Sequence, residues 1–98
     1  MKKHFNKLTP AEAERLAMLA EEAAEVIQIV GKILRHGYES HHPDDGGIDN
    51  RGLLNKELLD FIAVSSAMVN YGDIDAIYAR DATGRWAKKL RYTHHQEA

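Results

Sequence analysis

The stretch LAEEAAEVIQIV, residues 19–30, decides how the first half of the chain folds. Its apolar residues recur at three- and four-residue steps, the spacing that aligns side chains along one face of an α-helix. The same steps continue on both sides of the stretch and predict one helix over residues 9–35. The predicted apolar face comprises Leu16, Leu19, Ala20, Ala23, Ile27, Val30 and Leu34.

Both ends of this helix carry recognisable signals. Thr9 is a favourable N-cap, Pro10 suits the first helical position, and Glu12 has the spacing of a capping box. Lys32 and Arg35 place positive charge in the last turns, where it complements the helix dipole.

The remainder of the chain predicts an all-α protein. Residues 36–52 are rich in Gly, Pro, Asp and His, which indicates a loop over 36–50. Asp49 or Asn50 is the expected N-cap of the helix that follows. A second helix is expected over 51–71, a third over 73–92 with a bend near Thr83 and Gly84, and a polar tail over 93–98. The second helix is apolar nearly all round, which is typical of a helix buried on most sides. We therefore expect one domain, residues 1–98, built as a bundle of long antiparallel helices whose core is completed by other copies of the chain.

The composition of the chain argues against several classes of partner and site. The 98 residues carry a net charge of −2 and no cysteine, so neither general attraction to nucleic acid nor a thiolate metal site is expected. No apolar run approaches the roughly 18 residues of a membrane span, and no signal peptide is recognisable. These features predict a cytoplasmic protein.

Two acidic pairs interrupt the apolar helices. Glu22 and Glu25 are three residues apart on the flank of the first apolar face, whereas Glu21 falls on the solvent side with Glu14, Gln28 and Lys32. Glu57 and Asp60 repeat the spacing on the second helix, among apolar residues. Residues three apart are helical neighbours, so each pair can converge on one point.

Carboxylates in apolar surroundings need compensation. Pairing with Lys and Arg, protonation of one acid in each pair, or a divalent cation held by all four would provide it. The second acidic pair favours the cation, and an all-oxygen ligand set suits Mg²⁺, with Mn²⁺ as a substitute. Such a centre is typical of phosphoryl or nucleotidyl transfer.

The paired motifs EEAAE (residues 21–25) and ELLD (57–60) resemble the E-x-x-E … E-x-x-D signature of the MazG-like, all-α nucleoside triphosphate pyrophosphohydrolases. The segments AEVIQIVGKILRHGYES, NRGLLNKELLDFIA and KKLRYTHHQ are similar to small single-domain members often encoded by phages. The 31 residues between Glu25 and Glu57 are long for that family, and the additional length lies in the loop.

The resemblance implies Mg²⁺-dependent hydrolysis of a (d)NTP to the monophosphate and pyrophosphate, in control or cleaning of the nucleotide pool. Glu22, Glu25, Glu57 and Asp60 would be the metal ligands, and either Glu21 or one of these four would orient or deprotonate the attacking water. Members of the family form dimers or tetramers around a shared four-helix core.

Basic residues could hold the phosphate charge. The candidates, each of which can also be an ordinary solvated or dipole-complementing cation, are Lys32, Arg35, Lys56, Arg85, Lys88 and Arg91. The alternative function is a non-catalytic helical oligomerisation or antitoxin-like module, whose acids pair with Lys and Arg in structural networks. A third possibility is a pyrophosphatase that acts on phosphoribosyl-type substrates at the same site.

Overall fold

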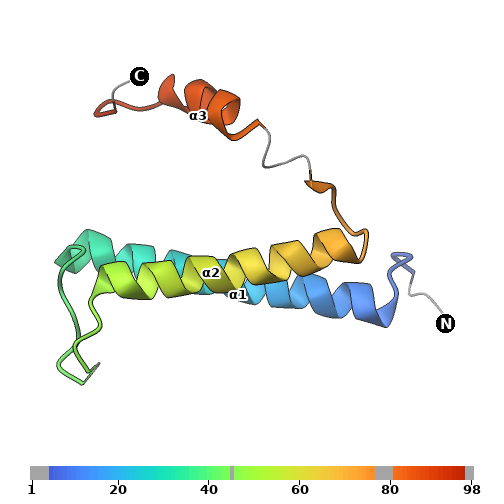
Figure 1. Ribbon diagram of the computed structural model, residues 1–98, viewed down its shortest axis with the longest axis horizontal. Helices are drawn as coiled ribbons and strands as arrows, with labels where there is room; N and C mark the ends of the chain where they lie inside the picture. Colours follow the sequence, from blue (N-terminus) through green and yellow to red (C-terminus); the bar gives the residue numbers. More distant parts are fainter. Residues whose placement is uncertain (1–4, 45, 77–80, 97–98) are drawn as a thin grey trace.

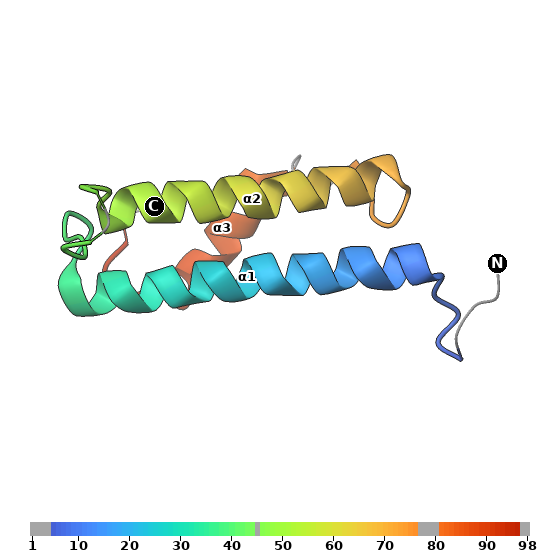
Figure 2. The ribbon, with the colours of Figure 1, turned by 90° about the horizontal axis from the view of Figure 1, so that it is seen from below.

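The computed structural model describes residues 5–44, 46–76 and 81–96. These residues form three helices and no strand: α1 (Pro10–His36), α2 (Asn50–Asn70) and α3 (Ala82–Leu90). The predicted all-α class is therefore confirmed for the described chain. The helices α1 and α2 lie side by side and antiparallel (Figures 1 and 2), whereas α3 stands apart from them (Figure 1).

The start of α1 is fixed by its own residues. Thr9 is extended, its Oγ1 accepts a hydrogen bond from the Glu12 backbone N–H over 3.1 Å, and its own N–H donates to Glu12 Oε1 over 2.8 Å. This is the predicted capping box. Gly37 ends the helix with a positive φ of 87°, and its N–H donates to the Ile33 carbonyl oxygen over 2.7 Å. Glycine adopts this backbone region without the strain of a side chain.

The loop between the helices is closed at its base by Asn50. This buried residue donates through Nδ2 to the Gly37 carbonyl oxygen over 3.1 Å, and its backbone N–H donates to the Ser40 carbonyl oxygen over 2.8 Å. Asp49 is the N-cap of α2, because its Oδ1 accepts from the Gly52 N–H over 2.9 Å. The ends of α1 and α2 are consequently held together.

The contact between α1 and α2 corrects the predicted core face of the first helix. Ile29 of α1 and Met68 of α2 are buried, whereas Ile27 is 71% exposed and Leu34 is 81% exposed. A stripe that includes Leu19, Glu22 and Ile29 is the more buried side of α1. The predicted stripe is uncovered because a single chain supplies α1 with only one long helical neighbour.

The predicted third helix over 73–92 is wrong in its first part. Residues 71–75 form a turn and a bend, and part of the predicted helix, 77–80, lies outside the described residues. Gly72 has a φ of 82°, and the Asp73 N–H donates to the Met68 carbonyl oxygen over 2.8 Å, so the chain turns away from the α2 axis. The helix α3 begins at Ala82 and contains Thr83 and Gly84 without a break.

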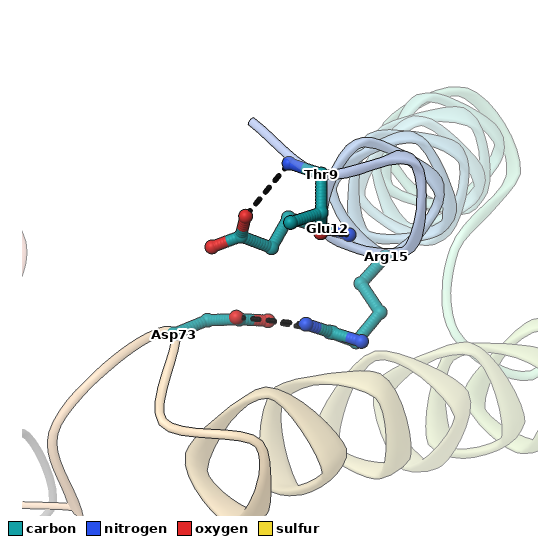
Figure 3. A network of polar contacts seen from close by, with 4 residues as sticks. All are labelled: Thr9, Glu12, Arg15 and Asp73. Atoms are coloured by element: carbon teal, nitrogen blue, oxygen red, sulfur yellow. Dashed lines mark hydrogen bonds and ion pairs between the residues drawn. The ribbon is translucent and has the colours of Figure 1, made fainter. Parts of the chain in front are cut away.

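The same turn is tied to the start of α1. Arg15 donates to Asp73 from Nε over 2.6 Å and from Nη2 over 3.0 Å (Figure 3). Its guanidinium also lies 4.4 Å from the centre of the Tyr71 ring. The Arg15 guanidinium lowers the pKa of the Asp73 carboxyl, chiefly through this hydrogen bond. A two-point contact of this kind fixes direction as well as distance. It anchors the far end of the α1–α2 hairpin.

Other predicted boundaries differ by one residue, as is common at helix ends. The helices predicted over 9–35 and 51–71 occupy Pro10–His36 and Asn50–Asn70. Residues 93–96 of the predicted tail are not helical, and residues 97–98 lie outside the described chain. None of the helices among the described residues has the length and hydropathy that crossing a membrane requires.

Candidate metal centre

Three of the predicted acids meet between α1 and α2. Glu22 and Glu25, one turn apart on α1, and Glu57 on α2 each offer a carboxylate oxygen, and these oxygens all lie within 4.8 Å of one another. The antiparallel pairing of the two helices brings them together across the sequence separation (Figure 2). We call these three residues the acidic cluster.

Two oxygens of the acidic cluster are buried without a hydrogen bond to any described residue. They are Oε2 of Glu22 and Oε2 of Glu57. The Glu57 side chain is only 15% exposed overall. Buried polar atoms are almost always satisfied, and a buried carboxylate oxygen without a donor is costly. The acidic cluster thus offers free lone pairs where the protein has removed much of the competing water.

The electrostatics of the acidic cluster favour protons or cations. Burial raises the pKa of Glu22, and the negative charges of Asp60, Glu21 and Glu57 raise it further. The pKa of Glu25 is raised first by a hydrogen bond with the Glu57 carboxyl, and then by the charge of that group and by burial. Either a proton or a metal ion relieves this repulsion.

Asp60, the fourth predicted ligand, lies beside the acidic cluster rather than in it. Its Oδ2 accepts a hydrogen bond from Lys56 Nζ over 3.1 Å, and its side chain is 45% exposed. Lys56 Nζ is also 3.5 Å from Glu57 Oε1, and the two carboxylates raise the pKa of Lys56. Lys56 is therefore placed as a screening cation on the α2 acidic pair.

Glu21 is exposed on α1, as the sequence predicts. Its charge nevertheless contributes to the raised pKa of both Glu22 and Glu25, so it lies near enough to act on the same centre.

A hollow of about 260 Å³ opens beside the acidic cluster. Its lining comprises Glu25, Gln28, Ile29, Lys32, Leu53 and Glu57. A second hollow, of about 370 Å³, lies where α1 ends and the loop begins, and Lys32 lines it too, with Arg35. The structure therefore brings Lys32 to the edge of the acidic cluster and Arg35 to the neighbouring hollow.

The other basic candidates are not gathered here. Arg85 and Lys88 lie on α3 and Arg91 directly follows it, and α3 stands off from the α1–α2 hairpin (Figure 1). Arg85 Nε is 3.9 Å from Asp81 Oδ2 on its own helix. The expectation that these residues flank the acids is not met within the described chain.

Sequence reasoning missed Gln28 and the histidines of the loop. Gln28 projects toward solvent in an isolated helix, yet it lines the hollow beside the acidic cluster, because α2 packs on a different stripe from the predicted one. His36, His41 and His42 line the second hollow. Their spacing does not suggest a metal site, and the folding of the loop onto the end of α1 is what collects them.

The residues present fit a hard divalent cation. Mg²⁺ binds oxygens at about 2.1 Å in an octahedron, so opposite ligands are about 4.2 Å apart. The three carboxylate oxygens lie within 4.8 Å of one another, which is near this separation. Three protein ligands would leave the remaining positions for water or other oxygen ligands.

Searches of protein-family models, of curated proteins and of solved structures found no match to this chain.

Proposed function

We propose that the chain is a Mg²⁺-dependent nucleoside triphosphate pyrophosphohydrolase of the MazG-like type, which converts a (d)NTP to the (d)NMP and pyrophosphate. The proposal rests on one observation above all. Glu22, Glu25 and Glu57 direct carboxylate oxygens to within 4.8 Å of each other, and two of their oxygens are buried without a partner among the described residues.

A structural salt-bridge network accounts less well for this arrangement. Among the described residues, Lys56 is the one cation paired with the α2 acids; its side chain is 65% exposed, and it pairs with Asp60 at a shorter distance than with Glu57. Glu22 Oε2 has no donor among the described residues. A network that existed to neutralise the acids would be expected to satisfy its most buried oxygens first.

In this proposal the acidic residues and Lys32 have separate roles. Glu22, Glu25 and Glu57 hold the cation, and Asp60 joins them when Lys56 releases it. A bound Mg²⁺ would polarise the phosphoanhydride and lower the pKa of a bound water. Glu21, or one of the ligands, orients that water or accepts its proton. Lys32, at the edge of the same hollow, binds the phosphate charge.

Association completes the fold in the same proposal. Large apolar side chains are exposed on both long helices, including Ile27 and Leu34 on α1 and Leu59, at 67%, on α2. A surface of this kind on a small chain is typical of one that packs against another copy. We infer a dimer or tetramer in which α1 and α2 of two chains build a four-helix core, at work in the cytoplasm on the nucleotide pool.

The second candidate is the non-catalytic helical oligomerisation or antitoxin-like module. It is favoured by the same exposed apolar residues and by the ion pairs that Lys56 makes with Asp60 and Glu57. It requires no metal and predicts no turnover.

The test is a product analysis by ³¹P NMR. The full chain is incubated with each dNTP and NTP, and with a phosphoribosyl-type pyrophosphate substrate, in Mg²⁺ with and without excess EDTA. The proposal expects a nucleoside monophosphate and pyrophosphate in Mg²⁺ alone. Release of orthophosphate and a diphosphate would contradict the assigned bond cleavage, and the absence of any metal-dependent product would favour the oligomerisation module. Selective turnover of the phosphoribosyl-type substrate would reassign the substrate but keep the site.

A further inference from the structure

The hollow at the end of α1 differs in chemistry from the acidic cluster beside it. Lys32, Arg35, His36, His41 and His42 line it, with Ser40, Pro43 and Asn50, and no acidic side chain of the described chain does. Its volume is about 370 Å³. We propose that this basic pocket is an oxyanion subsite that binds the phosphate chain of the substrate, and this identification of the anion rests on the proposed function.

The charge in the basic pocket comes chiefly from Lys32 and Arg35. Neither residue forms an ion pair with an acid in the described part of the chain, so both are available to a ligand. His42 Nδ1 accepts a hydrogen bond from the Asp44 backbone N–H over 3.1 Å, and it lies 3.7 Å from the exposed Asp44 carboxylate. Pro43 is the single apolar side chain among the described lining residues, and the other side chains supply polar groups that can donate to an anion.

The C-terminus of α1 and the N-terminus of α2 do not prevent an anion from binding in the basic pocket. The carbonyl end of α1 would repel it, but the Gly37 and Ile33 carbonyl oxygens already accept hydrogen bonds from Asn50 Nδ2 and the Gly37 N–H. The N-terminus of α2 starts at the same place with Asn50 in the pocket lining, but its first N–H groups already donate to the Ser40 and Tyr38 carbonyl oxygens and to Asp49 Oδ1. These terminal groups are therefore already paired at both helix ends, and the side chains decide whether the basic pocket attracts an anion.

Lys32 connects the two hollows. It lines both the basic pocket and the hollow that contains Glu25 and Glu57. It follows Glu25 by two helical turns, about 10 Å along the α1 axis. A phosphate chain with one end at the acidic cluster can therefore extend along α1 toward Arg35 and the loop histidines. This gives the long loop a function, because it carries His41 and His42 to the basic pocket.

The first experiment uses inorganic pyrophosphate without metal. The full chain is titrated by calorimetry in phosphate-free buffer with EDTA, where no metal is bound and the acidic cluster repels anions. The Lys32→Gln and Arg35→Gln variants are each expected to raise the Kd for pyrophosphate by about tenfold or more. Lys89→Gln on α3 removes the same charge from an exposed position and is expected to leave the Kd unchanged.

A second readout locates the anion. The imidazole resonances of His36, His41 and His42 are expected to shift with pyrophosphate, while those of His94 and His95 in the tail stay in place. Absence of metal-free binding, or equal effects of Lys32→Gln and Lys89→Gln, would overturn the basic pocket as an anion site.

A third experiment, by competition, distinguishes a subsite for the substrate from a site for a free anion. A non-hydrolysable nucleoside triphosphate with Mg²⁺ is expected to compete with pyrophosphate for the wild-type chain. Simultaneous, independent binding of both would overturn the assignment to the substrate. If turnover fails but metal-free pyrophosphate binding persists and depends on Lys32, the proposed function falls while the anion site stands.

Discussion

Glu25 on α1 and Glu57 on α2 bring carboxylate oxygens to within 4.8 Å of each other, although 31 residues separate them in the sequence. Two carboxylates this close repel each other unless a proton or a cation lies between them. The fold accepts this local cost in a chain that otherwise has a small buried core. Such a local cost is expected at a functional site rather than in a purely structural contact.

The first prediction concerns stability without metal. The pKa of Glu22 and of Glu25 is raised in the folded chain, so folding favours their protonated forms. Stability is therefore higher near pH 4.5 and falls as the pH rises from the ordinary Glu value, about 4.3, through the raised values. We expect Glu25→Gln to unfold at a higher temperature than wild type at pH 7.5 in EDTA, with a smaller difference at pH 4.5.

Thermal unfolding followed by circular dichroism measures this effect. Glu14→Gln, an exposed substitution on the same helix, is the control and should follow wild type. The contribution of Asp73 to folding stability depends on pH in the opposite direction. Because the pKa of Asp73 is lowered in the folded chain, this contribution is lost only as the pH falls below about 4, outside the range from pH 4.5 to 7.5. The repulsion argument would be contradicted if wild type unfolds at the same temperature at pH 7.5 as at pH 4.5, and at the same temperature as Glu25→Gln.

The second prediction concerns turnover. Glu57→Gln is expected to reduce pyrophosphate release by more than about a hundredfold, because it removes a ligand charge from the acidic cluster. Asp60→Asn is expected to abolish turnover as well, since Asp60 completes the ligand set. Both variants should remain folded by circular dichroism. Activity that survives both changes would show that these carboxylates do not hold the catalytic metal.

The third prediction decides the role of Lys56. Its Nζ pairs with Asp60 and Glu57, so a divalent cation must compete with it. Lys56→Gln is therefore expected to tighten Mn²⁺ binding several-fold, measured by electron paramagnetic resonance, and to leave the KM for the nucleotide nearly unchanged. If the variant instead raises KM without changing metal affinity, Lys56 is a phosphate contact.

The fourth prediction concerns association. Ile27 is 71% exposed on the apolar stripe of α1 that α2 leaves uncovered. Wild type and Ile27→Leu are expected to sediment as a dimer or tetramer, whereas Ile27→Lys should approach the 11.0 kDa monomer. Sedimentation of wild type as a monomer at micromolar concentration would contradict the shared four-helix core.

Local features of the sequence predicted local structure well. The Thr9 capping box, the Asp49 cap and the three-residue spacing of Glu22 and Glu25 each depend on residues within one turn, and all are present in the structure. The bounds of α1 and α2 follow for the same reason, because caps and glycines act on their neighbours.

Contacts between residues far apart in the sequence could not be predicted from those local patterns. The first helix also carries apolar residues outside the predicted face, and packing against α2 buries the stripe that contains Ile29. The Arg15–Asp73 pair joins residues 58 positions apart and holds Asp73 in a turn where a helix was expected. The basic pocket depends on how a loop folds onto a helix end. In each case the deciding contact comes from a distant part of the chain.

The most direct test of the central claim is Mn²⁺ binding measured by electron paramagnetic resonance on the full chain, without nucleotide. The acidic cluster predicts that wild type and Glu14→Gln bind Mn²⁺, that Mg²⁺ displaces it, and that Glu25→Gln and Glu57→Gln each lose most of the affinity. Equal Mn²⁺ binding by all four proteins, or none by wild type, would contradict a metal centre formed by Glu22, Glu25 and Glu57.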